Sequence, residues 1–394
     1  MAENVKTVAL RKGGDKRLRS GHLWVFSNEL ESIDKTVTPS DTIHVLDDAG
    51  HVLGTGYMNP NSLIAVRLLA RSRVEITPSF LKRRLKHALA FREKLLPGET
   101  TYRAVYSESD LLPGLIVDRY DSTLAVQSLT AGIESRLDVI VELLDELLKP
   151  DTIVLRNDAR IRELEGLPRE KKVVKGDADS PVQVSLDGTK LLVDVEGGQK
   201  TGLFLDQREN RRAAARLAAG RDVLDCCSYT GAWSLAAAAQ GAASVTGFDS
   251  SAPALELADR NATLNGFADK VEFVRGDMFK SLANLSRSKR KFGLVFLDPP
   301  ALAKNRKRIR EALRAYRSLN RLAMSTLSPG GFLVTSTCSH LVEREAFLNT
   351  LVAAAKEAGR HARIVEVRGQ SRDHPVILGH PETEYLTCVT LEML

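Results

Sequence analysis

Hydrophobic residues along the chain follow two different periods, and the period changes near residue 75. Before that point, short runs alternate between hydrophobic and polar residues and are separated by turn residues, a pattern typical of β-strands over 42–46, 51–58 and 63–69. From Thr77 to Gly98, apolar residues repeat every four positions behind a Thr-Pro start, which predicts an amphipathic helix. We therefore expect a small β-rich domain over residues 1–74.

The pattern from residue 75 to about 180 mixes both periods. Apolar runs predict strands at 115–118, 124–127 and 152–156, and a helical repeat predicts one helix over 133–148. This strand-strand-helix-strand order indicates a small α+β module. Its residues carry no identifiable chemistry, so its expected use is to space or guide the substrate.

Residues 181–394 have the pattern of a larger α/β domain. A hairpin around Asp187-Gly188 is followed by strands ending near residues 225, 248, 275, 297 and 335, with helices between them. Alternating strands and helices predict a doubly wound, mainly parallel sheet. The fold class is therefore α/β, preceded by the β-rich domain and the α+β module.

Four successive strands of this domain end in an aspartate. In parallel sheets these ends meet at one edge, where ligands bind. A single aspartate there is commonly a helix cap, but four in register favour a ligand site. The four residues are Asp225, Asp249, Asp277 and Asp298.

The loop after the first of these strands, residues 225–231, contains one glycine, Gly231, and lacks the Gly-x-Gly-x-x-Gly fingerprint of dinucleotide sites. A small polar cofactor is expected instead of a tightly held pyrophosphate. Asp249 is the expected ribose ligand, because one carboxylate can accept both hydroxyl protons of a ribose.

This series of acids resembles the class I S-adenosylmethionine-dependent methyltransferases, whose domain is a Rossmann-like sheet of seven strands. The resemblance implies S-adenosylmethionine as cofactor. It places Asp225 and the loop beside the methionine part, Asp249 at the ribose, and Asp277 at the adenine, and it makes Asp298-Pro299-Pro300 a catalytic signature. The implied cofactor-binding residues are Asp225, Ser228, Tyr229, Thr230, Gly231, Asp249, Asp277, Met278 and Asp298.

Composition is that of a globular protein of two or three domains, with 394 residues of which 43% are hydrophobic. No charged-then-apolar leader and no apolar run near the roughly 18 residues of a membrane span is present. We expect a cytoplasmic protein that does not bind membranes. Four cysteines, at 226, 227, 338 and 388, give neither a disulfide framework nor zinc spacing, so no metal is expected.

The net charge of +6 is unevenly distributed. One basic run lies over residues 6–19 with Asp15 as its single acid, and a second lies over 304–321 with Glu311 as its single acid. Each run taken alone is compatible with a solvated helix face. Two such runs, one directly after Asp298-Pro299-Pro300, favour nucleic acid as a partner.

Residues 12–26 resemble the opening of a PUA RNA-binding domain. Judged without that resemblance, Trp24 and Phe26 at alternate positions are expected to point into the core. The string Lys200-Thr201-Gly202 to Asp206-Gln207-Arg208 is similar to one in the bacterial large-subunit ribosomal RNA cytosine methyltransferases. This resemblance covers nearly the whole chain and implies that Gln207 and Arg208 lie on the cofactor side. One departure is Ala301-Leu302-Ala303-Lys304, where relatives have lysine and an aromatic residue, which puts a base-stacking contact in doubt.

The predicted catalytic pair is Cys338 and Asp298. Ser336-Thr337-Cys338-Ser339 follows the fifth strand and resembles the cysteine motif of RNA cytosine carbon-5 methyltransferases. Carbon-5 of cytosine is a poor nucleophile until a thiolate adds to carbon-6, and Asp298 is suited to hydrogen-bond the ring nitrogen or the exocyclic amine of the adduct. A free thiol titrates near ~8.5, so we expect the site to lower that value. Cys388 is expected to be an inert buried residue.

We therefore expect methylation of carbon-5 of one unpaired or flipped cytosine in large-subunit ribosomal RNA. Two alternatives stay open. The first is N-methylation of a base such as guanine on the same fold. The second is a non-catalytic RNA-binding assembly factor. The sequence does not identify which cytosine is modified or whether the substrate is naked RNA or an assembled subunit. It also does not identify the base that removes the carbon-5 proton or show whether the protein is a homodimer.

Overall fold

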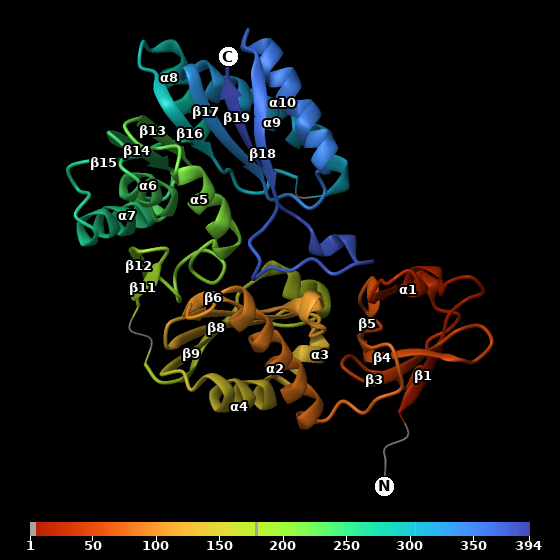
Figure 1. Cartoon of the computed structure of the whole chain (residues 1–394). Coiled ribbons are helices and arrows are strands. Elements are labelled where there is room, and N and C mark those ends of the chain that lie inside the picture. The colour runs from red at the N-terminus through yellow and green to blue at the C-terminus, as the bar shows by residue number, and fades with distance from the viewer. Residues whose placement is uncertain (1–4, 178–179, 304) are drawn as a thin grey trace. The chain divides into compact units, whose positions relative to one another are not determined.

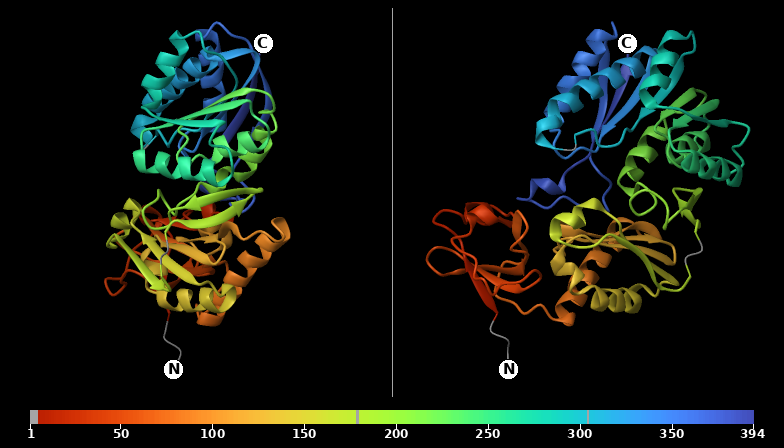
Figure 2. Two further views of the ribbon diagram at one scale, coloured as in Figure 1. Left: turned by 90° about the vertical axis from the view of Figure 1, so that its left-hand side faces the viewer. Right: turned by 180° about the vertical axis from the view of Figure 1, so that it is seen from behind.

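The computed structural model describes residues 5–177, 180–303 and 305–394 and divides into two compact units. The first unit contains Met1–Val182, Val193–Leu205 and Arg372–Thr383, and the second contains Gln183–Leu192, Asp206–Ser371 and Glu384–Leu394. Figures 1 and 2 show the elements of both units. Lys304, a member of the second basic run, lies outside the described residues.

The first sheet of the first unit has the order β1-β3-β4-β5-β2. Its strands enclose a core that includes Val25, Ile43 and Val66. The strand predicted at 42–46 is confirmed, and the next two start and end within one residue of their predicted limits; the two short outer strands β1 and β2 were not predicted. The elements are β1 (Lys6–Ala9), α1 (Lys16–Arg19), β2 (Trp24–Phe26), η1 (Ser27–Glu29), β3 (Thr42–Leu46), β4 (Val52–Met58) and β5 (Ile64–Ala70).

The expectation that Trp24 and Phe26 point into the core is met in part. Both are half-buried, whereas Val25 between them is fully buried. Val25 lies inside the core and Trp24 packs against it, while Phe26 does not belong to it. The Trp24 indole N–H donates to Glu108 Oε1 at 2.8 Å, and the Arg17 guanidinium lies over the Phe26 ring.

The second sheet of the first unit has the order β10-β9-β8-β7-β6, so it contains two strands more than the sequence predicted. β10 reads Glu-Lys-Lys-Val-Val-Lys and lacks hydrophobic alternation, which explains why the pattern did not reveal it. The elements are α2 (Pro78–Leu95), β6 (Thr101–Tyr106), η2 (Ser107–Asp110), β7 (Leu115–Tyr120), β8 (Thr123–Ser128), α3 (Ala131–Glu134), α4 (Leu137–Leu148), β9 (Thr152–Asn157), η3 (Arg160–Glu165) and β10 (Glu170–Lys175).

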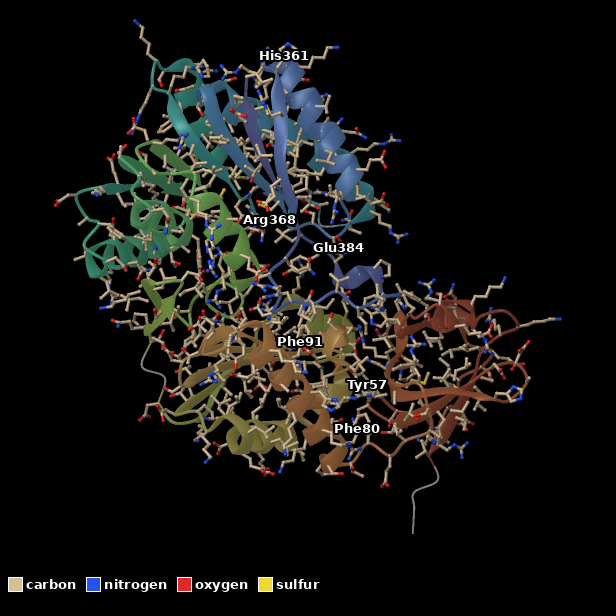
Figure 3. The ribbon with its side chains drawn as sticks, viewed as in Figure 1. Tyr57, Phe80, Phe91, His361, Arg368 and Glu384 are labelled. Atoms are coloured by element: carbon tan, nitrogen blue, oxygen red, sulfur yellow. The ribbon has the colours of Figure 1, made fainter. Side chains whose placement is uncertain are left out.

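The helix predicted over 133–148 is two helices, α3 and α4, with a break at Ser135 and Arg136. The Arg136 guanidinium donates to the Gly132 carbonyl at 2.8 Å across the break. Apolar residues on both sides of it are buried in one core, so the hydrophobic repeat continues where the backbone does not. Tyr57 and Phe80, labelled in Figure 3, belong to the same core.

The second unit is built on a seven-stranded sheet of order β15-β14-β13-β16-β17-β19-β18, in which only the pairs of β19 are antiparallel. This confirms the Rossmann-like methyltransferase fold class. The elements are β11 (Val182–Leu186), β12 (Thr189–Val193), η4 (Leu205–Gln207), α5 (Arg208–Ala215), β13 (Asp222–Cys226), α6 (Ala232–Ala239), β14 (Ser244–Asp249), α7 (Ala252–Leu264), β15 (Val271–Arg275), α8 (Met278–Arg287), β16 (Phe292–Leu297), η5 (Arg306–Arg308), α9 (Ile309–Ser325), β17 (Leu327–Thr337), α10 (Arg344–Glu357), β18 (Ala362–Arg368) and β19 (Thr387–Met393). The short helix η6 (Pro381–Thr383) precedes β19 in sequence and belongs to the first unit.

Helices cover both faces of this sheet: α8, α9 and α10 pack together on one face, and α5, α6 and α7 lie on the other (Figure 1). Alternation along β13 sends Leu224 and Cys226 into the core under α8–α10, and it turns Asp225 toward α6. Asp225 therefore lies on one face of the sheet, while Leu224 and Cys226 fill the core on the other face.

We propose that the chain consists of three domains, with boundaries at residues 74 and 180.

Helix α10 offers a test of this packing. We expect Leu351→Ala to lower the free energy of unfolding by about 2–5 kcal/mol, because Leu351 is 4% exposed and its loss leaves a cavity. Its neighbour Val352 is 69% exposed, so Val352→Ala should change the free energy by less than about 0.5 kcal/mol. Urea denaturation of both variants measures the difference, and equal effects would contradict the burial of this helix face.

Candidate active site

The four aspartates predicted at strand ends lie at one edge of the sheet. Asp225 is the penultimate residue of β13, Asp249 is the last residue of β14, Asp277 lies two residues beyond β15, and Asp298 directly follows β16. Their strands are consecutive neighbours in the order β15-β14-β13-β16. The parallel pairing therefore collects all four carboxylates along the carboxyl edge of these strands.

Asp225 is a fully buried carboxylate that is only half satisfied. Its Oδ2 accepts hydrogen bonds from the backbone N–H of Ser234 at 3.1 Å and from the Ser234 hydroxyl at 2.6 Å. Its Oδ1 has no hydrogen-bond partner among the described residues. Burial raises the pKa of Asp225 to about 7, and the negative charge of Asp298 adds to the effect.

The loop that follows β13 turns sharply around the carbonyl of Phe248. The backbone N–H groups of Cys227 and Ser228 both donate to that oxygen at 3.0 Å. Gly231 has φ +83°, and a Cβ at that position would lie 2.7 Å from the Phe273 ring, so a larger residue is excluded. Thr230 is held by its carbonyl, which accepts from the Asn261 side chain at 3.0 Å.

The second and third acids already have local partners. Asp249 accepts hydrogen bonds from the backbone N–H groups of Tyr229 and Ser251, at 3.0 Å and 2.9 Å. Asp277 caps α8 by accepting from the N–H groups of Phe279 and Lys280 through Oδ1. Asp277 is therefore the cap of α8. Both of these hydrogen bonds go to Oδ1, so the cap does not need Oδ2.

The residues at this edge fit S-adenosylmethionine. That molecule carries a sulfonium, an ammonium and two ribose hydroxyls, which all favour carboxylate or hydroxyl oxygens as partners. Two buried oxygens, Asp225 Oδ1 and Ser228 Oγ, lack partners among the described residues. Met278 lies beside the same loop, with its sulfur 3.5 Å from the Cys227 sulfur. A cationic ligand with hydroxyls would satisfy both orphaned oxygens.

Asp298, the fourth acid, is held through both carboxylate oxygens. Oδ1 accepts from the Gln207 amide at 2.8 Å, and Oδ2 accepts from the Trp233 indole N–H at 3.1 Å. Desolvation by the surrounding protein raises the pKa of Asp298 to about 6, while these two hydrogen bonds lower it. Sequence reasoning did not single out Trp233, although its place two residues after Gly231 puts it in the first turn of α6.

The two residues predicted on the cofactor side from the Asp206-Gln207-Arg208 string are both buried. Gln207 bridges Asp298 and the hydroxyl of Ser336, 3.1 Å away. Arg208 lies 3.3 Å from Asp187 in the turn of the β11–β12 hairpin. Gln207 thus lies at the edge where the acids gather, while Arg208 has an ion pair with the hairpin turn.

Cys338 lies at the same edge, directly after β17. It is half-buried, and its sulfur is 3.8 Å from the carbonyl oxygen of Pro299, the residue after Asp298. The two residues predicted as the catalytic pair therefore lie at the same edge of the sheet, with Cys338 beside the residue that follows Asp298. Cys388 is buried, and burial raises the pKa of its thiol to about 12, which agrees with the expected inert role. His340 is exposed.

Among the described residues, one group has a spacing that suits a metal ion: His22, His380 and Glu382 in the first unit, with ligand atoms within 4.8 Å of one another. The Nδ1 atoms of both rings accept backbone N–H bonds, from Trp24 and Leu23. In the neutral rings the protons are then on Nε2, and His22 Nε2 lies 3.0 Å from Glu382. This geometry fits a hydrogen-bonded cluster, because a metal-binding histidine donates through its other nitrogen.

No helix in the described part of the chain is long and apolar enough to cross a membrane.

Comparison with known proteins identifies two families along the chain. Residues 8–71 match a model of the PUA-like domain, and residues 171–374 match a model of S-adenosylmethionine-dependent methyltransferases. A neighbour in fold, a methyltransferase solved in complex with SAH, has a TM-score of 0.84 at 20% identity and covers 98% of this chain and 99% of its own. A protein assigned as a SAM-dependent methyltransferase from Streptococcus mutans has a TM-score of 0.83 at 19% identity, with 98% and 100% covered.

Curated relatives are similar over nearly their full length. Ribosomal RNA large subunit methyltransferase I of Alteromonas mediterranea is 39% identical over 98% of both chains. The protein of the same name from Aeromonas salmonicida is 37% identical over 96% of this chain and 97% of its own. The resemblance predicted from the sequence is confirmed, and with it S-adenosylmethionine as the cofactor. The chain therefore belongs to the S-adenosylmethionine-dependent methyltransferase family that includes the ribosomal RNA large subunit methyltransferase I proteins.

Proposed function

We propose that this protein methylates carbon-5 of a cytosine in large-subunit ribosomal RNA through a covalent adduct with Cys338. The observation that carries the proposal is the position of Cys338, whose sulfur lies 3.8 Å from the carbonyl of Pro299 and so beside Asp298 at the sheet edge of the four acids. The names of the curated relatives supply the substrate class. The cytoplasm is the proposed compartment, because ribosomal RNA is the proposed substrate.

In the proposed reaction the Cys338 thiolate adds to carbon-6 of the cytosine, and the electron pair of the 5,6 double bond makes carbon-5 nucleophilic. S-adenosylmethionine supplies the methyl group as an electrophile when it is bound. Asp298 accepts a hydrogen bond from the exocyclic amine and so stabilises the adduct. A base then takes the carbon-5 proton, and the electron pair of that bond restores the double bond and expels the Cys338 thiolate.

The proposed cofactor-binding residues follow the sheet edge. Asp225 and the loop residues Ser228, Tyr229, Thr230 and Gly231 are assigned to the methionine part, which agrees with the two orphaned buried oxygens there. Asp249 is assigned to the ribose, and Asp277 with Met278 to the adenine. Gln207 and Arg208 complete the set on the neighbouring side.

The proposed RNA contact on the second unit is the basic run at η5 and α9. Arg306, Arg310 and Arg314 are spaced four residues apart. All three are exposed and have no ion-pair partner among the described residues. Lys307 is likewise exposed and has no ion-pair partner among them. Farther along α9, Arg317 and Arg321 pair with Glu357. The free cations lie at the start of the helix that follows Asp298-Pro299-Pro300, which suits a phosphate backbone leading to the target base.

The first prediction concerns the nucleophile. We expect Cys338→Ala to reduce methyl transfer to ribosomal RNA by more than about a thousandfold, because the variant lacks the thiolate that forms the proposed adduct. Label from S-adenosylmethionine should be found in 5-methylcytidine after digestion of the product to nucleosides. Cys388→Ala is the matched control, since burial raises the pKa of that thiol to about 12 and so keeps it from acting as a nucleophile, and the variant should retain the label. Label in another nucleoside, or full activity of Cys338→Ala, would favour methylation of a ring or exocyclic nitrogen instead.

A second prediction concerns the basic run. Arg310→Ala with Arg314→Ala should weaken RNA binding and make the dependence of log K on log salt shallower by up to about 1.4, because each phosphate contact to a single strand contributes about 0.7. Filter binding over a salt series measures the slope. Arg363→Ala is the control, since Arg363 on β18 pairs with Glu392 at 3.2 Å. Identical slopes in the native chain and the double variant would exclude this surface from the RNA contact.

A further inference from the structure

The carboxylate of Asp298 is fixed by two neutral donors from separate elements. Gln207 comes from η4, immediately before α5, and Trp233 comes from the first turn of α6. They donate to different oxygens, at 2.8 Å and 3.1 Å. A carboxylate held at both oxygens cannot rotate about its terminal bond without losing a hydrogen bond, so the plane of the group is defined.

The direction of the Gln207 amide is also determined. The Asn210 side chain donates to Gln207 Oε1 at 2.7 Å, and this directs Nε2 toward Asp298 and Ser336. Asn210 is fixed in turn, because it donates to the carbonyl of Gly369 at 3.0 Å and accepts from Arg368 at 3.2 Å. Arg368, labelled in Figure 3, is the last residue of β18. A continuous chain of hydrogen bonds thus runs from the end of β18 to the Asp298 carboxylate.

Trp233 is fixed by packing. Its side chain is buried, and its ring lies against Phe296 with 4.9 Å between the ring centroids. Phe296 is in β16, two residues before Asp298, and its side chain shares a face of the sheet with that carboxylate. A phenylalanine at position 233 could fill the same space but could not donate to Asp298.

The groups that act on Asp298 come from several elements. Desolvation and the carboxylate of Asp206 favour the protonated form, and Asp225 on β13 is a further acid nearby. Arg211 on α5 and the two neutral donors favour the ionised form. Cys227 and Cys388, whose thiols interact with Asp298, have pKa values raised by burial and are neutral at ordinary pH. The balance gives Asp298 a pKa of about 6.

We propose that Gln207 and Trp233 are positioning residues that hold the Asp298 carboxylate ionised and in one orientation, so that its remaining lone pairs accept the exocyclic amine of the target base. The assignment to a base with an amine rests on the proposed function. An ionised carboxylate attracts the amine of cytosine and repels the carbonyl oxygen that uracil has at the same place. The two donors therefore contribute to the choice of cytosine as well as to the rate.

The first experiment tests the hydrogen bonds without any assay of methylation. The chain has two tryptophans, so in a Trp24→Phe background Trp233 is the single indole. Its fluorescence should change with pH with a midpoint near 6, because protonation of Asp298 removes the acceptor of its N–H. Asp298→Asn should abolish the transition. Gln207→Leu should move the midpoint upward by about one pH unit, since it removes a donor that favours the charged form.

Gln240→Leu is the matched control, because Gln240 is exposed at the end of α6, and its midpoint should equal that of the background. A transition that survives Asp298→Asn belongs to another group and overturns the proposal. An unchanged midpoint in Gln207→Leu overturns it as well. These results stand whether or not 5-methylcytidine is the product, so failure here is distinct from failure of the proposed function.

The second experiment uses the rate. In Trp233→Phe the pKa of Asp298 should rise by about one unit, so less of it is ionised at low pH, and kcat should fall about threefold at pH 6.5 but change little at pH 8.5. The KM for S-adenosylmethionine should stay within about twofold. A purely structural loss would lower kcat equally at both pH values, and that result, or no loss at all, contradicts the proposed role of Trp233.

Discussion

The parallel pairing of β13 with β14 on one side and β16 on the other determines where the acids of the active site lie. Asp225 is in register with Gly247 of β14 and with Phe296 of β16. Because the three strands run in the same direction, their carboxyl ends stop together, and the residues beyond them share one edge. A shift of one residue in this register would turn Asp225 into the apolar core under α8–α10 and would separate it from Asp298.

This arrangement concentrates negative charge in a place where water is scarce. Burial raises the pKa of both the Asp225 and the Asp298 carboxyl. The charge of Asp298 adds to the rise at Asp225, and the charge of Asp206 adds to the rise at Asp298. The direct donors to both are neutral groups, namely the Ser234 backbone and hydroxyl, the Gln207 amide and the Trp233 indole. Neutral donors orient the carboxylates without cancelling their charge. The edge therefore stays attractive to a cationic methyl donor.

The two basic runs differ in a way that local charge counting does not reveal. In the first run, Lys6, Arg17 and Arg19 pair with Asp41, Glu29 and Asp47, which are distant in sequence. In the second, the cations nearest Asp298-Pro299-Pro300 have no such partners among the described residues. Folding pairs three cations of each run with acids, and in the second run Arg306, Lys307, Arg310 and Arg314 at its start have no ion-pair partner among the described residues.

The sequence by itself determined the class of fold and the strand-end acids, because these depend on local features such as hydrophobic period and turn residues, and a family resemblance carried by its short motifs implied the cofactor. The sequence missed β1, β2, β6 and β10, the break between α3 and α4, and the half-buried state of Trp24 and Phe26, because a sheet partner or a continuous core overrides the local pattern there. Only the tertiary structure paired Gln207 and Trp233 with Asp298. Those hydrogen bonds join residues 65 or more positions apart, and no local pattern records a contact made by three elements that meet at one strand end.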